Sequence, residues 1–169
     1  MAESRLSPIL QALYGGDREE AERLRRKHPD VDVFDAAALG DAARLAEHLD
    51  ADAEAAQARS VDGFTALHYA AYFGGPEATR FLIENGADIE APSTNMEFAR
   101  EARPLHSAVA AGNKDAALVL LEAGADPNAR QHGGFTPLMA AEQSGNLDLA
   151  EMLIRFGARA GGVGLPGDR

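Results

Sequence analysis

Two histidines occupy matching positions in the sequence and could carry chemistry. His68 ends a Thr-Ala-Leu-His segment, and His106 ends an Arg-Pro-Leu-His segment. Imidazoles of this kind can ligate a metal ion or act as general bases. Adjacent helices pack about 8–10 Å apart, which is too far for two helical histidines to share one ion through bonds of about 2.0–2.1 Å. We therefore expect structural roles for both histidines, and no metal site.

Two other segments could bind ions, but each lacks a necessary part. The run Gly161-Gly162-Val163-Gly164 has the glycines of a phosphate loop, but no lysine and no helix are expected after it. The acidic run from Asp50 to Glu54 lacks the central glycine and the terminal glutamate of a calcium loop. We interpret residues 161–169 as a flexible tail and the acidic run as a solvated connector. We expect no catalytic residue and no cofactor.

The composition excludes several classes of protein. The chain has 169 residues and no cysteine, which excludes a disulfide scaffold, a thiolate zinc site and a cysteine nucleophile. Its 46% hydrophobic content predicts a folded core. The net charge of −11 argues against unaided binding to nucleic acid or to an anionic membrane. With neither a signal peptide nor an apolar run of about 20 residues, we expect a cytoplasmic protein.

The negative charge is concentrated in one stretch of the chain. Residues 31–90 carry twelve acidic and three basic side chains, whereas residues 1–30 are neutral overall. One interpretation is a solvated face that keeps the protein soluble. The other is an acidic patch that attracts a basic partner.

An internal repeat is the strongest signal in the sequence. Copies begin at Thr65, Arg103 and Thr136, in steps of 38 and 33 residues, and fainter copies precede them. A glycine follows 21 residues after each of these starts. The copies predict turn glycines at Gly16, Gly40, Gly74, Gly112 and Gly145, and helix-ending glycines at Gly86, Gly124 and Gly157.

Each copy is expected to form two short helices. Leu67, Ala70 and Ala71 follow the i, i+3, i+4 spacing of a helical stripe. Thr65 suits the N-cap of the first helix, and Gly74 is expected to end that helix with a positive φ. Two helices of this length cannot bury a core alone, so the copies are expected to stack as a solenoid.

The segments 65–68, 103–106 and 136–139, each followed by Gly-Ala-Asp or Gly-Ala-Arg, resemble ankyrin repeats. The resemblance implies an all-α solenoid of paired antiparallel helices with β-turn or hairpin loops. It also implies that His68 and His106 bond to backbone and tether neighbouring repeats. The expected units are a degenerate N-terminal capping helical pair at 1–30, repeats at about 31–60, 61–98, 99–131 and 132–160, and the tail at 161–169.

This sequence departs from the family pattern in three places. The first repeat lacks the Thr-Pro-Leu-His signature, Met139 stands where histidine is expected, and one repeat step is five residues too long. The irregular step argues against an idealised consensus design. Abundant alanine and arginine with only two lysines hint at a bacterial source.

The resemblance further implies that a partner is bound by the hairpin tips and the exposed face of the first helices. The candidate residues there are Asp62, Phe64, Tyr72, Phe73, Arg100, His132, Phe135, Gln143 and Ser144. The four aromatic members predict an exposed strip, although Phe64 and Phe135 could instead brace adjacent hairpins. The insertion at 92–100 adds Met96 and Phe98 as candidates, and a neutral loop expansion is the alternative.

The sequence therefore predicts a protein–protein interaction module. We expect it to be monomeric alone and to bind another protein that carries a basic patch. An enzyme or small-ligand-binding protein and a purely homotypic assembly are the alternative functions. If the aromatic strip has a purely structural role, replacing Tyr72 and Phe73 with alanine should lower the melting temperature instead of weakening binding.

Overall fold

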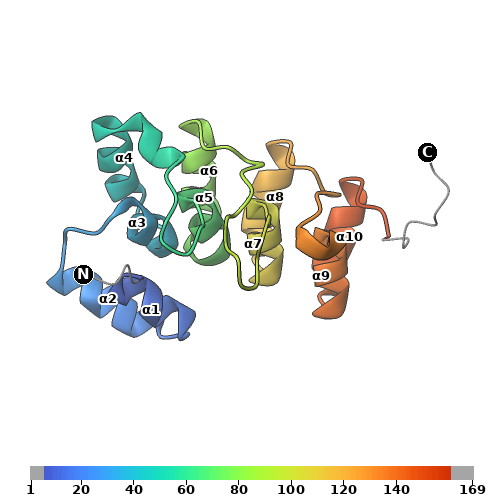
Figure 1. The fold of residues 1–169 in the computed structure, drawn as a ribbon, viewed down its shortest axis with the longest axis horizontal. Helices are drawn as coiled ribbons and strands as arrows, with labels where there is room; N and C mark the ends of the chain where they lie inside the picture. The colour runs from blue at the N-terminus through green and yellow to red at the C-terminus, as the bar shows by residue number, and fades with distance from the viewer. Residues whose placement is uncertain (1–5, 161–169) are drawn as a thin grey trace.

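The computed structural model describes residues 6–160, and this part of the chain contains ten α-helices and no strand (Figure 1). The all-helical fold predicted from the repeats is thereby confirmed. The helices are α1 (Pro8–Tyr14), α2 (Arg18–Lys27), α3 (Val33–Leu39), α4 (Ala42–Ala51), α5 (Ala66–Tyr69), α6 (Pro76–Glu84), α7 (Pro104–Ala110), α8 (Lys114–Glu122), α9 (Pro137–Gln143) and α10 (Leu147–Arg155).

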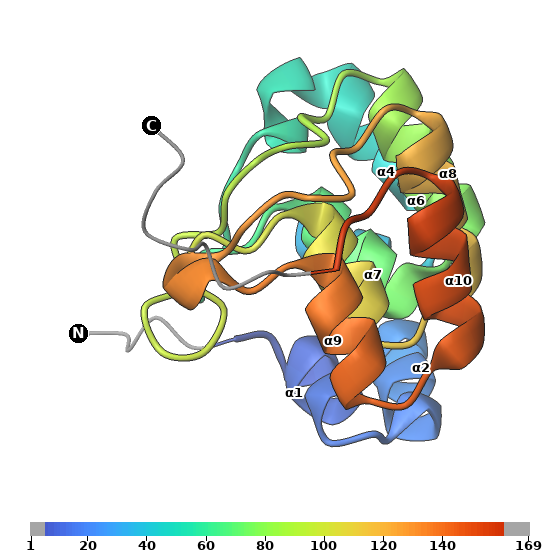
Figure 2. The same cartoon turned by 90° about the vertical axis from the view of Figure 1, so that its right-hand side faces the viewer.

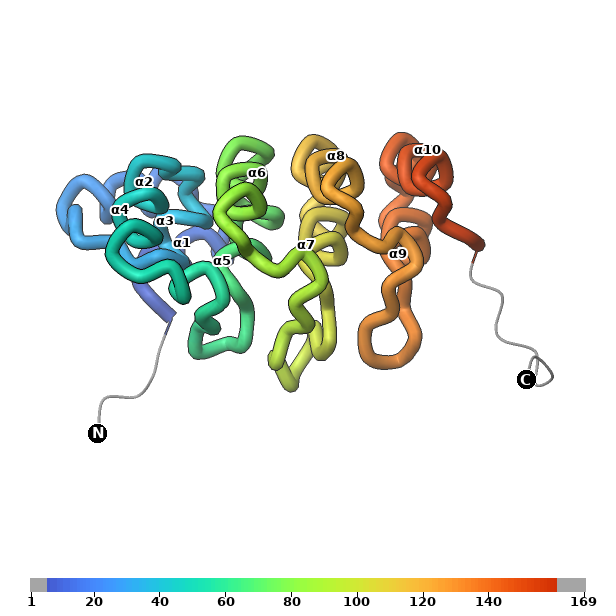
Figure 3. Tube along the Cα trace, turned by 90° about the horizontal axis from the view of Figure 1, so that it is seen from above, coloured from blue at the N-terminus to red at the C-terminus, as the bar shows by residue number. Residues whose placement is uncertain are grey.

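From α3 onward the helices form two layers in an elongated stack. The first helices of the repeats, α3, α5, α7 and α9, form an inner layer, and α4, α6, α8 and α10 form an outer layer (Figure 2). Seen from above, the pairs stand in a row along the long axis (Figure 3). The loops 58–65, 91–103 and 128–136, here called fingers, project from the inner layer on the side away from the outer helices.

Leucine and alanine fill the space between the layers. Alanines at the helix contacts, such as Ala70, Ala108 and Ala141, are fully buried and allow neighbouring helices to approach closely. The leucines that are at most 1% exposed include Leu67, Leu82, Leu105, Leu120, Leu138 and Leu153. Because these positions recur in each repeat, the core is continuous along the stack.

Most inner and outer helices are joined by a glycine followed by a capping side chain. Gly112 and Gly145 have φ of 68° and 70°. The side chain of the asparagine that follows each glycine, Asn113 or Asn146, accepts a hydrogen bond from the backbone amide three residues later. The αL glycine closes the inner helix and the asparagine begins the outer one. Gly40 and Asp41 make the same turn in the first repeat.

The expectation that Gly74 supplies the positive φ in the second repeat is wrong. Gly75 does so, with φ of 89°, and α5 continues as a π turn over Ala70–Gly74. Gly75 stands directly before α6, at the position that Asn113 and Asn146 hold before α8 and α10, and it has no side chain that could cap the helix. Because glycine tolerates a positive φ, Gly75 makes the turn itself, and the helical segment continues through Gly74. Gly74 instead makes a close backbone contact with the first repeat.

The N-terminal helix pair lies beneath the first two repeats instead of extending the stack. α1 and α2 are below α3 and α5 in Figure 1, and they overlap α3 when seen from above in Figure 3. The glycines that close α1 and α3, Gly16 and Gly40, are only 24 residues apart, and the linker 28–32 is too short for a finger. Residues 8–27 therefore form a helical hairpin that has no finger of its own.

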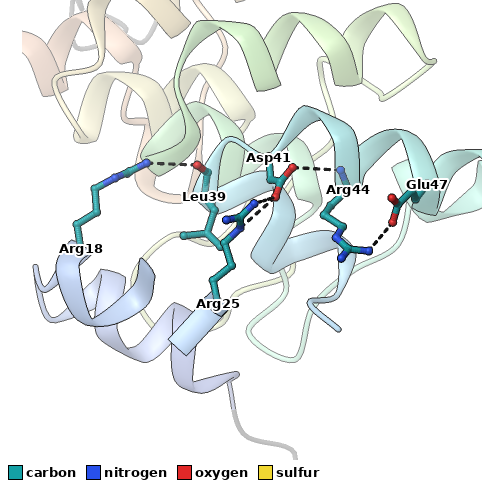
Figure 4. Close-up of polar contacts among 6 residues, drawn as sticks. All are labelled: Arg18, Arg25, Leu39, Asp41, Arg44 and Glu47. Atoms are coloured by element: carbon teal, nitrogen blue, oxygen red, sulfur yellow. Dashed lines mark hydrogen bonds and ion pairs between the residues drawn. The ribbon is translucent and has the colours of Figure 1, made fainter. Parts of the chain in front are cut away.

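Polar contacts hold this hairpin against the stack. Arg18 donates to the carbonyls of Phe73 (3.0 Å) and Leu39 (3.3 Å), which lie at the ends of two inner helical segments. Arg25 forms an ion pair with Asp41, the capping residue of α4 (Figure 4). Burial raises the pKa of Asp41, but the hydrogen bonds from Arg25 and the Arg44 amide outweigh it and leave the pKa below its usual value.

Candidate protein-binding surface

Two buried histidines fix the inner helices to the fingers. The His68 Nδ1 accepts a hydrogen bond from the Thr65 amide (3.2 Å), and its Nε2 donates to the Ala102 carbonyl in the 91–103 finger (3.0 Å). His106 makes the same contacts with the Arg103 amide (3.1 Å) and with the Phe135 carbonyl in the 128–136 finger (3.3 Å). Each histidine therefore links its own repeat to the next one.

These histidines are neutral at physiological pH. Burial is the main cause that lowers the pKa of both His68 and His106 to about 4. Both ring nitrogens of each histidine already have a backbone partner. Neither side chain is available to a substrate or ion.

The insertion at 92–100 folds around Asn95, which is buried. Its Oδ1 accepts hydrogen bonds from the amides of residues 97, 98 and 99 at 3.0–3.2 Å. Its Nδ2 donates to the Asp62 carbonyl (3.0 Å), and the Thr94 amide donates to the Gly63 carbonyl (2.9 Å). The insertion is thus an ordered loop, fastened to the preceding finger.

The contact with the preceding finger requires a glycine. Gly63 has φ of 87°, and a Cβ added there would lie 2.5 Å from the Asn95 amide nitrogen. On the other side of the insertion, the His132 amide donates to the Arg100 carbonyl (2.9 Å). Hydrogen bonds therefore join all three fingers into one row.

This row presents apolar side chains to solvent. Met96 and Phe98, at the tip of the insertion, are 72% and 68% exposed. Val61 on the preceding finger is 55% exposed, and Phe135 on the following finger is 45% exposed. Large apolar side chains on rigid loops are typical of recognition surfaces.

The predicted aromatic strip is only partly present. Phe64 is 6% exposed and packs against Tyr69 and Phe98 with ring centroids 6.0 and 6.3 Å apart, so its expected place on the binding surface is wrong. Phe73 is half-buried because the Tyr14 ring of α1 packs edge-on against it at 5.2 Å. Tyr72, whose ring is tilted against that of Phe73 with centroids 4.6 Å apart, is exposed.

Tyr14 and Tyr69 also belong to this surface, through hydrogen bonds to Asp62, although the sequence analysis did not include them. The Tyr14 hydroxyl donates to Asp62 Oδ2 (3.2 Å), and the Tyr69 hydroxyl donates to Asp62 Oδ1. Burial, together with the nearby carboxylate, raises the pKa of both tyrosines. Only the tyrosine content of α1 and α5 hinted at this contact, because residues 14 and 62 are far apart in the sequence.

A groove of about 740 Å³ lies between α1 and two fingers. Leu6, Gln11 and Tyr14 line one side, and residues 60–63 and 94–98 line the other. Of the sequence candidates, the groove brings together Asp62, Met96 and Phe98. The candidates that do not line it are Phe64, Tyr72, Phe73, Arg100, His132, Phe135, Gln143 and Ser144.

The described part of the chain contains neither a metal-binding cluster nor a membrane-spanning helix. Within residues 6–160, no three histidine or acidic side chains lie close enough together to hold a metal ion. None of the helices in that range has the length and apolarity needed to cross a membrane.

The repeated helix pairs and finger loops, with their histidine tethers, lie in the part of the chain that a known protein family matches. A family model described as ankyrin repeats (3 copies) matches residues 3–131 and 94–161. The chain is an ankyrin-repeat protein. Ankyrin repeats generally mediate protein–protein interactions, and the family is typically non-enzymatic.

Curated relatives of this ankyrin-repeat chain are much longer proteins. It is 36% identical over 105 residues to the B-cell lymphoma 3 protein homolog of Mus musculus, covering 62% of this chain and 22% of that protein. It is 36% identical over 110 residues to the putative palmitoyltransferase ZDHHC13 of Danio rerio, covering 64% and 16%. It is 42% identical over 94 residues to the neurogenic locus notch homolog protein 4 of Homo sapiens, covering 54% and 4%. The chain spans less than a quarter of each of these relatives.

Proposed function

We propose that this ankyrin-repeat chain binds a partner protein through its row of fingers. The observation that carries the proposal is the set of exposed apolar side chains on three successive fingers, Val61, Met96, Phe98 and Phe135. The composition, which lacks cysteine, supports a reducing compartment such as the cytoplasm.

Rigidity makes this surface suited to binding. The backbone of Met96 and Phe98 is held by Asn95, and the fingers are joined by amide–carbonyl hydrogen bonds. A partner that contacts these side chains does not need to order the loops first, so less conformational entropy is lost on binding. Aromatic and methionine side chains are also enriched at the centres of protein interfaces.

Removal of the two most exposed finger side chains tests this function. We expect the double variant Met96→Ala/Phe98→Ala to bind at least about tenfold more weakly, since each hot-spot side chain contributes about 1–2 kcal/mol. The measurement is the affinity for binders selected on the unmodified protein from a phage-displayed library of random 16-residue peptides. Thermal unfolding should change little because neither side chain is buried.

A matched control removes two exposed apolar side chains from the outer layer. Leu147 and Ile154 on α10 are 77% and 55% exposed and lie away from the fingers. Leu147→Ala/Ile154→Ala should leave peptide binding unchanged. Equal weakening by both double variants, or a library that yields no binder, would contradict the proposal. Self-association abolished by the finger variant alone would point to a homotypic assembly instead.

A further inference from the structure

We infer that the groove between α1 and the 58–65 and 91–103 fingers binds a short segment of the partner in which apolar residues flank lysine or arginine. This inference rests on the proposed function and names the kind of partner that the surface fits. It also assigns a binding role to α1, which lies outside the stacked repeats.

Both walls of the groove are held in place. The α1 wall is fixed by Ser7, which precedes α1 and donates to Asp35 on α3. The adjoining α2 is fixed by Arg18, which donates to the carbonyls of Leu39 and Phe73. Tyr14 joins the two walls directly, because its hydroxyl bonds to Asp62 on the opposite finger. The groove is therefore preformed, as is usual for ligand sites.

The groove has an apolar lining. Tyr14 is exposed on the α1 side of the groove, and Val61, Met96 and Phe98 are exposed on the finger side. These side chains can cover one or two apolar side chains of an incoming segment. A volume of about 740 Å³ falls in the range of roughly 300–1,000 Å³ that bound ligands occupy. It accommodates a few residues of polypeptide and not a folded domain.

The groove also carries negative charge. The two charged residues among the lining side chains, Asp62 and Glu97, are both acidic. Within residues 6–160 neither forms an ion pair. Arg59 and Arg100, which belong to these two fingers, do not line the groove. Arg59 donates to the Gly63 carbonyl, and Arg100 lies 3.9 Å from Glu101.

The surrounding part of the chain is also negatively charged and therefore also favours a basic segment. Residues 31–90, which include the 58–65 finger, carry twelve acidic and three basic side chains. This excess of negative charge attracts a basic segment and raises its association rate. The increase in rate becomes smaller as salt is added, because salt screens the charges. Charge complementarity therefore favours a basic and apolar segment over an acidic one.

The test begins with the peptides selected from the random library. We expect them to be enriched in lysine or arginine next to apolar residues, compared with the unselected library. One selected peptide is then synthesised with a fluorescent label, and its affinity for each variant is measured by anisotropy at low and high salt. Its affinity should fall as salt rises.

Two matched pairs of variants locate the site. Glu97→Gln should weaken binding about two- to fivefold, the effect of one exposed ion pair, whereas Glu84→Gln on α6 should not. Gln11→Lys, which places a positive charge on the α1 wall, should weaken binding by a similar factor, whereas Ala43→Lys on α4 should not. All four positions are exposed, so folding should be unaffected.

The outcomes separate this inference from the proposed function. Selected peptides without basic enrichment, or binding that is unchanged by both Glu97→Gln and Gln11→Lys, would overturn the inference. If those peptides still lose affinity to Met96→Ala/Phe98→Ala, the finger surface remains the binding site with a different partner chemistry. Peptides insensitive to every one of these variants would overturn both.

Discussion

Gly74→Ala is expected to destabilise the protein by about 3 kcal/mol, at the upper end of the usual cost of overpacking. A Cβ at this position would lie 2.0 Å from the carbonyl oxygen of Ala37. The clash is with backbone, so no side-chain rotation can relieve it. The two helical segments would have to move apart, and the small fully buried alanines between the first two repeats would lose contact.

A second glycine provides the control for this prediction. Gly15 also follows a helix without a positive φ, but a Cβ there would have its nearest atoms at 3.4 Å, an ordinary contact. Gly15→Ala should change the free energy of unfolding by less than about 0.5 kcal/mol. Urea unfolding of both variants checks the prediction, and equal stabilities would show that the first two repeats do not pack as closely as described.

Acid is expected to destabilise the protein well above the pH at which ordinary carboxylates titrate. The pKa of His68 and His106 is about 4 in the folded protein, compared with about 6.5 when unfolded. A lowered folded pKa gives stability that is present above pH 6.5 and is lost as the pH falls towards 4. Each histidine accounts for about 3 kcal/mol of lost stability at pH 4.

Asp35 opposes this loss. It is buried at the contact between α1 and α3, and burial raises its pKa to about 6. A raised folded pKa favours the folded state at low pH, and this contribution disappears as the pH rises through 6. Between pH 7 and pH 4, protonation of Asp35 adds about 2 kcal/mol to the free energy of unfolding. The net loss of stability is therefore expected to be about 3–4 kcal/mol.

Asp35→Asn distinguishes the two contributions. The variant should be more stable than the unmodified protein at pH 7 and should lose more stability on acidification, about 6 kcal/mol between pH 7 and pH 4. Asp115→Asn, at an exposed position on α8, should leave the profile unchanged. Urea unfolding at several pH values measures these slopes. A shallower slope in Asp35→Asn would contradict the assignment.

The parts of the structure that recur were accessible from the sequence. The spacing of Leu67, Leu105 and Leu138 predicts the inner helices because each one packs the same way against its neighbours. The positive φ of Gly112 and Gly145 follows from the same local pattern. In the second repeat the sequence has two adjacent glycines, Gly74 and Gly75, and the repeat pattern does not indicate that Gly75 takes the positive φ.

The parts that depend on non-repeated contacts were not accessible. Nothing near Phe64 indicates that Tyr69 and the inserted loop will cover it, because Phe98 lies 34 residues away in the chain. The position of α1 depends on long-range partners such as the Tyr14–Asp62 contact. The role of Asn95 is equally hidden, since an asparagine within a polar loop has no distinctive spacing.

Chemical-shift mapping tests the central claim, protein binding by the fingers, most directly. The ¹⁵N-labelled protein is titrated with a peptide selected from the library, and perturbed amides are placed on the structure. We expect perturbations concentrated at residues 60–63 and 94–98 and on α1 near Gln11, with α8 and α10 unaffected. Perturbations concentrated on the outer helices, with the fingers unchanged, would contradict this claim.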